Sequence, residues 1–219
     1  MTLPADHYRV LKRELSLGEI LADGIVHALA LLAGLIAFPL LLFHALQSSG
    51  IGMLVALAVY AAGFFLMWGF SLAYNMTPPS ALKWLLRRFD HSMIYVMIAG
   101  TYTALIPHLS GAWPWVLGGV VWTGAALGIL VKVALPGRYD RLSILAYVLL
   151  GWVGVIAIGP VTSALPAQSL WLLVAGGATY VAGVAFYVWQ GLRFQNAIWH
   201  GFVAVAAGLH FAAVAVAVA

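Results

Sequence analysis

The sequence has no cysteine and little charge. Without thiols, disulfide bonds and thiolate metal sites are excluded. Charged residues make up 7% of the chain, against roughly 25% in an average soluble domain. Hydrophobic residues make up 64%, so the composition excludes a soluble globular domain and indicates an integral membrane protein. The ten Lys and Arg residues are scattered singly or in pairs, and we expect no nucleic-acid partner.

Seven apolar runs reach the roughly 20 residues that a helix needs to cross a bilayer core. They lie at 23–46, 51–75, 90–109, 112–135, 142–161, 167–190 and 196–219. The alternation expected of a membrane barrel is absent. We therefore predict an all-α membrane protein, a seven-transmembrane helix bundle over residues 23–219. Residues 1–22 are predicted to form a cytoplasmic tail, with an interfacial helix over 8–17.

The positive charges predict how the bundle is oriented. With seven spans, all Lys and Arg residues fall at one end: before the first span, between the second and third, around the end of the fourth, and between the sixth and seventh. The positive-inside rule makes that end cytoplasmic. We predict a multi-pass protein of a bacterial inner (plasma) membrane, with its N-terminus inside and its C-terminus outside.

Residues 87–95 contain the most unusual acid in the chain. Asp90 follows the basic pair Arg87-Arg88 and leads into an apolar run without charge. An ionisable group at membrane depth is costly and by default marks a functional site. The alternative is an acid in the first turn of a helix, where it caps free N–H groups and complements the helix dipole.

Other polar residues are predicted to lie in the same leaflet as Asp90. Three pairs at spacing i, i+4 each share one helix face, and each is expected at the cytoplasmic end of its span: Asp23 with His27, Ser71 with Asn75, and Asn196 with His200. His210 lies ten residues beyond His200, about 15 Å along a helix. It is therefore too far to share one ion with His200, and we predict a hydrogen-bonded histidine there.

These segments resemble the hemolysin III family, which is related to the adiponectin and progestin receptors. The resemblance runs from about Gly18 to the last span, and it is most specific in two segments: Phe89-Asp90-His91-Ser92-x-Ile94-Tyr95-x-x-Ile98-Ala99-Gly100-Thr101-Tyr102-Thr103 and Ile198-Trp199-His200. It implies a zinc site in the cytoplasmic leaflet, formed by a Ser-x-x-x-His pattern and a His-x-x-x-His pattern. It also implies that Asp90 and Ser71 line that site, and that the chemistry of some relatives is hydrolysis of lipid amides such as ceramide.

The sequence departs from this pattern at two of the three implied zinc ligands. The positions read Asn75, Asn196 and His200. A carboxamide oxygen is a hard, neutral ligand that suits zinc poorly, so we expect zinc affinity to fall by orders of magnitude. Three interpretations stay open: a metal-free polar network that joins the spans, a metal site with altered ligands, or a different site that uses His27 with Asp23.

Three functions follow from these interpretations. The first is a lipid-interacting sensor or regulator of membrane state with a degenerate metal site. The second is a metal-dependent lipid hydrolase, ceramidase-like, with Asp90 and Ser71 as catalytic residues. The third is a pore-forming or cytolytic protein. In each case we expect membrane lipids as partners, and zinc is the cofactor that the resemblance implies.

Overall fold

The computed structural model describes residues 15–219, and every regular element in that part of the chain is helical. Its eight α-helices are α1 (Leu17–Ser48), α2 (Ile51–Met76), α3 (Ala81–Leu105), α4 (Trp113–Ala134), α5 (Asp140–Gly151), α6 (Ile158–Ala164), α7 (Ala167–Val188) and α8 (Gln195–Val218). Two short 3-10 segments, η2 (Ile106–His108) and η3 (Val153–Ala157), complete the chain. The predicted all-α class is confirmed. The predicted interfacial helix over 8–17 lies almost entirely outside the described residues.

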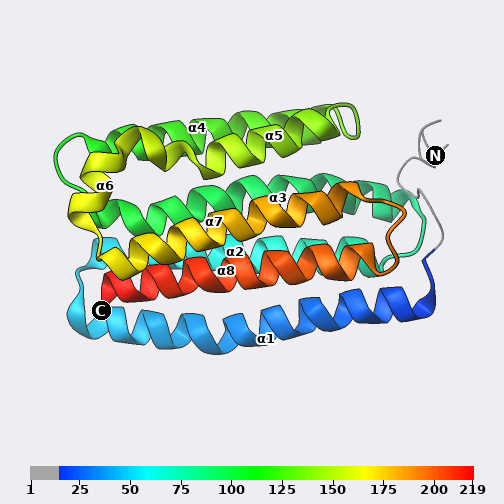
Figure 1. Cartoon of the computed structure of the whole chain (residues 1–219), viewed down its shortest axis with the longest axis horizontal. Coiled ribbons are helices and arrows are strands. Elements are labelled where there is room, and N and C mark those ends of the chain that lie inside the picture. The colour runs from blue at the N-terminus through cyan, green and yellow to red at the C-terminus, as the bar shows by residue number, and fades with distance from the viewer. Residues whose placement is uncertain (1–14) are drawn as a thin grey trace.

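The long helices run side by side along the long axis of the molecule (Figure 1). α2 packs between α1 and α3, α3 packs on α4, and α8 packs between α1 and α7. α1 begins at one end of the bundle and α8 ends at the other (Figure 1). Because successive helices alternate in direction, the starts of α1, α3, α5 and α8 lie at the same end as the ends of α2, α4 and α7.

Local sequence signals fix where the helices begin and end. Ser16 caps α1 in a capping box, in which Glu19 Oε2 accepts the Ser16 N–H at 3.0 Å. The turn after α2 contains Pro78-Pro79, which cannot continue a helix, and Ser80 then caps α3. Lys83 Nζ donates to carbonyls at the C-terminal end of α2, including that of Tyr74 at 2.8 Å. This bond satisfies a group that the helix itself leaves unpaired.

α2 and α3 approach each other closely through two glycines. A Cβ on Gly100 would lie 3.3 Å from the backbone of Tyr60, and a Cβ on Gly63 would lie 3.2 Å from the Val96 carbonyl oxygen. Small residues allow such approach between helices in membranes. The contact holds the polar segment of α3 beside the end of α2 that carries Ser71.

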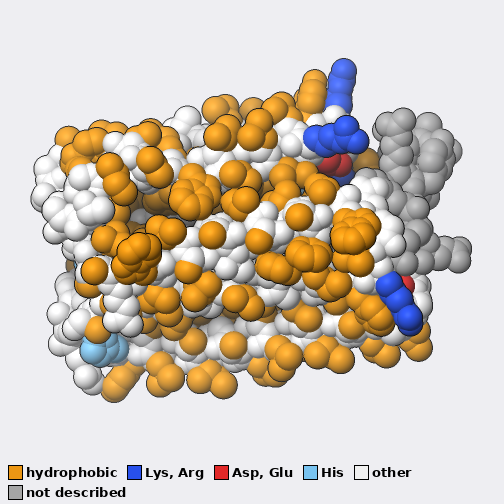
Figure 2. Space-filling view, viewed as in Figure 1, with side chains coloured by type: hydrophobic (Ala, Val, Ile, Leu, Met, Phe, Trp, Pro, Cys, Tyr) orange, Lys and Arg blue, Asp and Glu red, His pale blue; other side chains and the backbone are white. Residues whose placement is uncertain are grey.

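Six segments are long and apolar enough to cross a membrane: α1, α2, α4, Asp140–Ala164, α7 and α8. Hydrophobic side chains cover the length of the face in Figure 2, and the Lys and Arg side chains visible there lie at one end. This pattern is that of a multi-pass membrane protein. The predicted fifth span is broken into α5, η3 and α6, in a region that contains Gly151, Gly154, Gly159 and Pro160.

α3 differs from the prediction at its start. The sequence analysis placed the third span at 90–109, but α3 begins at Ala81. Asp90 therefore lies about two and a half turns inside the helix. The interpretation of Asp90 as a first-turn cap is wrong, because Ser80 already caps α3 and no acidic residue lies in its first turn.

Candidate metal centre

The candidate site begins with two buried residues one turn apart on α1. Asp23 is 2% exposed and His27 is fully buried. His27 Nδ1 lies 2.8 Å from the backbone carbonyl oxygen of Asp23. Because a carbonyl oxygen can only accept, Nδ1 carries the proton. In the neutral ring, Nε2 is then left with its lone pair.

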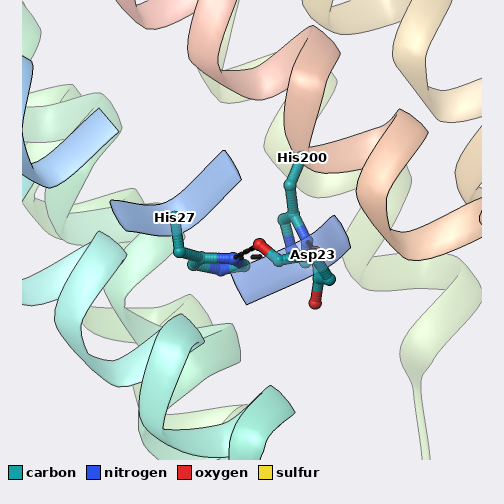
Figure 3. Close-up of side chains that lie close together, drawn as sticks. All are labelled: Asp23, His27 and His200. Atoms are coloured by element: carbon teal, nitrogen blue, oxygen red, sulfur yellow. Dashed lines mark hydrogen bonds and ion pairs between the residues drawn. The ribbon is translucent and has the colours of Figure 1, made fainter. Parts of the chain in front are cut away.

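His200 on α8 meets the same acid. Its Nδ1 lies 2.5 Å from Asp23 Oδ1, and its ring centroid lies 4.4 Å from that of His27. Figure 3 shows the three side chains converging from α1 and α8. A carboxylate also only accepts, so Nδ1 of His200 donates and its Nε2 keeps the lone pair.

A contact near the starts of both helices holds α8 against α1. Glu19 Oε1 accepts the Phe194 N–H at 2.9 Å, just before α8 begins. Phe194 has a φ of 59°, in the left-handed region that non-glycine residues seldom adopt. Glu19 therefore joins the two elements that carry Asp23, His27 and His200.

Ser71 on α2 lies between the two imidazoles. Its Oγ is 3.1 Å from His27 Nε2 and 3.4 Å from His200 Nε2. One hydroxyl has one proton, so it can satisfy only one of the two lone pairs. A metal ion, a second proton or a water from the adjoining cavity would pair the other nitrogen.

The donor set fits a metal ion. Asp23, His27 and His200 are all buried, and each offers one ligand atom. These three atoms lie within 4.8 Å of one another. Imidazole nitrogen and carboxylate oxygen bind zinc at about 2.0–2.2 Å, which places ligand atoms about 3.3 Å apart in a tetrahedron. Metal-bound histidines usually donate their second ring N–H to a carboxylate or carbonyl, as His27 Nδ1 does to the Asp23 carbonyl and His200 Nδ1 does to Asp23 Oδ1. For Asp23 to bind the same ion as the two Nε2 atoms, its carboxylate would have to turn away from the His200 N–H and toward them.

The two asparagines form an amide link beside this cluster. Asn75 Nδ2 donates to the Ser71 carbonyl at 2.9 Å and lies 3.3 Å from Ser71 Oγ. Asn196 Nδ2 donates to Asn75 Oδ1 at 3.4 Å. The structure thus brings Ser71, Asn75, Asn196 and His200 together, as their spacing predicted. Metal binding by the two asparagines stays a prediction.

Asp90 and Ser71 line one large cavity with His200. The cavity has a volume of about 900 Å³, and its wall also includes Trp68, Asn75 and Asn196. The Asp90 carboxyl interacts electrostatically with both His200 and Ser71. The acid that stood out in the sequence therefore faces the same space as the histidine cluster.

From the sequence, Asp23 and His27 were predicted only as an alternative site. The signal that marks them is their i, i+4 spacing at the polar end of an apolar run, which places both on one face of α1. Their convergence with His200 depends on which side of α1 faces α8, and spacing alone does not supply this. His210 is hydrogen-bonded as predicted, with Nε2 3.2 Å from the Leu173 carbonyl oxygen.

The fold and the site define a class: a multi-pass helical membrane protein with a buried two-histidine, one-carboxylate cluster beside an internal cavity. Residues 19–211 match the family model described as Haemolysin-III related. The chain belongs to the hemolysin III family, which confirms the resemblance inferred from residues 89–103 and 198–200.

Relatives of this chain include bacterial and mammalian proteins. It is 37% identical over 187 residues to Hemolysin-3 of Bacillus cereus, covering 84% of this chain and 85% of that one. It is 33% identical over 186 residues to the Hemolysin-3 homolog of Bacillus subtilis (strain 168), covering 84% and 87%. It is 30% identical over 131 residues to the human Monocyte to macrophage differentiation factor, covering 57% and 52%.

Proposed function

We propose that this protein is a metal-dependent hydrolase that cleaves an amide or ester bond of a membrane lipid. The observation that carries the proposal is the convergence of His27, His200 and Asp23 beside a cavity with a large apolar wall. Two histidines and one carboxylate are a ligand set that catalytic zinc sites use, with a fourth position left for water or substrate.

In this proposal, Asp23, His27 and His200 would hold the ion, and zinc bound there would supply an activated water and polarise a carbonyl group. Asp90 lines the cavity with His200 and interacts electrostatically with it, so it would act as the general base that takes a proton from the reacting water. With the two Nε2 atoms bound to the ion, the Ser71 hydroxyl between them would be free to orient the water or the reacting group. The apolar wall of the cavity binds the acyl chain and excludes water from the site.

Turnover of defined lipids tests the proposal. The purified chain is reconstituted in liposomes that contain a ceramide and a phospholipid, and released fatty acid is measured by mass spectrometry. Replacing a general base typically lowers a rate by about 10²–10⁴-fold, so Asp90→Ala is expected to lower turnover at least about 100-fold. His44→Ala changes an exposed histidine on α1 and serves as the control. Equal turnover in Asp90→Ala, or no product from either lipid, contradicts the proposal.

A second candidate is a lipid sensor without turnover. The observation that favours it is the chain of bonds from Ser71 through Asn75 to Asn196, which joins α2 and α8 through amides alone. A network of this kind couples helix positions to the contents of the cavity. Lipid-dependent stabilisation with no product would support this candidate, and a hydrolysed lipid would rule it out.

We also infer that α3 is a seventh crossing and that the basic end of the bundle is cytoplasmic. α3 has 25 residues, and from His91 to its end it carries no Lys, Arg, Asp or Glu. Its charged residues all lie at the end shared with the starts of α1, α5 and α8. By the positive-inside rule this end faces the cytoplasm of the inner membrane, with the end of α8 outside.

A further inference from the structure

A second charged cluster lies where α3, α4 and α5 meet, away from the histidines. Arg87 Nη2 donates to Asp140 Oδ2 at 2.5 Å, and Lys132 Nζ donates to Asp140 Oδ1 at 2.9 Å. Arg87 is 9% exposed and Lys132 is 3% exposed. Two buried cations thus share one carboxylate, and the group keeps a net positive charge.

Burial makes this surplus charge costly unless an anion compensates it. The neighbouring groups on α3 do so only in part. Lys83 is another cation, and its ammonium group donates to carbonyl oxygens at the end of α2. His91 lies between the two acids, with Nδ1 4.0 Å from Asp140 Oδ1 and Nε2 3.7 Å from Asp90 Oδ2. Asp90 interacts electrostatically with Arg87 and Lys83 as well as with His200, so its single charge is shared among several partners.

The charged cluster lines the same cavity as His200 and Ser71. Four cationic side chains are in the wall at this end, together with two carboxylates: Lys83, Arg87, Lys132 and Arg141 against Asp90 and Asp140. Figure 2 shows basic side chains beside an acidic one at this end of the otherwise hydrophobic face.

Beyond the charged end the cavity is apolar and long. Its wall follows α3 from Lys83 to Leu105, about 33 Å at 1.5 Å per residue. That length is comparable to the roughly 30 Å hydrocarbon core of a bilayer. The wall therefore offers a charged site at one end and room for acyl chains over the rest.

The cavity also opens sideways. Several of its lining side chains on α7 and on the segment from η3 to α6 are themselves exposed: Val155, Ile158, Trp171, Val174, Val181 and Val188. All are hydrophobic, and in a membrane this seam faces lipid. A lipid can thus enter from the bilayer without passing through water.

From this arrangement we propose that the Arg87–Lys132–Arg141 end of the cavity binds the phosphate of an anionic phospholipid, whose acyl chains lie along α3. This site deepens the proposed hydrolase, because it names the class of substrate that the histidine cluster meets, but its binding is measured without turnover. Charge-assisted bonds to phosphate suit Arg and Lys.

Binding of two lipids that differ in head-group charge tests the proposal. The full chain in neutral detergent is titrated with phosphatidylglycerol or phosphatidylcholine, and bound lipid is counted by native mass spectrometry. We expect preference for phosphatidylglycerol. One Lys or Arg near an anionic lipid corresponds to about a fivefold change in affinity, so Arg141→Gln should weaken phosphatidylglycerol binding by about that factor.

Arg138→Gln is the matched control, because Arg138 is three residues from Arg141 and does not line the cavity. Lys132→Met serves as a second variant, with folding checked by its melting temperature. Equal binding of the two lipids, or equal loss in Arg138→Gln, overturns the proposal. Inorganic phosphate that displaces phosphatidylglycerol at equal concentration would show a site for the free anion and overturn it as well.

The outcomes for the two proposals can be separated with His27→Ala. This change should abolish turnover and leave phosphatidylglycerol binding intact. Lipid binding without product in the wild type would contradict the hydrolase alone. Hydrolysis of an uncharged lipid, with no preference for phosphatidylglycerol, would contradict the phosphate site alone.

Discussion

At the residue scale, the feature that favours a bound ligand is the number of hydrogen-bond donors around Ser71. His27 and His200 each donate Nδ1–H to an oxygen of Asp23, and each presents Nε2 to the Ser71 hydroxyl. Two lone pairs meet a single proton. Ser71 alone leaves one of them without a donor, and a buried acceptor left unpaired costs about 1–3 kcal/mol. A metal ion, a second proton or a water in the cavity would each remove that cost.

The sequence predicted part of this site. Ser71, Asn75, Asp90, Asn196 and His200 were placed in one leaflet from their positions at span ends, and the structure brings Ser71, Asn75, Asn196 and His200 into contact. Hydrogen bonding between α1 and α8 could not be predicted in this way, because it depends on how each helix is rotated about its axis. Asp23 and His27 were therefore predicted only as an alternative site.

At the element scale, the α2–α3 contact sets where Asp90 and Ser71 face each other. Gly63 and Gly100 let the backbones of the two helices meet. The start of α3 at Ala81 was not predicted, because Arg87-Arg88 was assigned to the link between two spans, whereas the helix runs through both residues.

We predict that Gly100→Ala destabilises the protein. The added Cβ would lie 3.3 Å from the backbone of Tyr60, where no flexible side chain can move aside. Overpacking of this kind typically costs about 1–3 kcal/mol. Thermal unfolding in detergent measures the change as a lower melting temperature.

Gly69→Ala is the control for that measurement. Gly69 lies in the same helix α2, and a Cβ there would have no heavy atom within 4 Å. Alanine also favours a helix over glycine by about 1 kcal/mol. An unchanged or higher melting temperature is expected for Gly69→Ala, and an equal loss in both variants would show that the α2–α3 approach is not the cause.

At the scale of the whole molecule, the basic side chains gather at one end of the bundle. Every Lys and Arg in residues 15–219 lies at the end where α1, α3, α5 and α8 begin. The family could be assigned from the sequence, because the motif over residues 89–103 is specific to it. The number of crossings depends on α3, whose first half is charged and whose second half is apolar.

Cysteine labelling can measure the topology directly, since the chain has no native cysteine to interfere. Ser49→Cys follows α1, Ser110→Cys follows η2, and Arg138→Cys lies in the turn before α5. A membrane-impermeant maleimide added to intact inner-membrane spheroplasts should label Ser49→Cys and Ser110→Cys. Arg138→Cys should be labelled only after lysis. Labelling of Ser110→Cys only after lysis would show that α3 does not cross.

The account rests most directly on a metal ion held by Asp23, His27 and His200, and elemental analysis of the purified, detergent-solubilised protein measures it. We predict about one transition-metal ion per chain in the wild type, the same content in His44→Ala, and loss of the ion in His27→Ala. A wild type that contains no metal after purification without chelators, or a His27→Ala variant that retains the full content, would contradict the account.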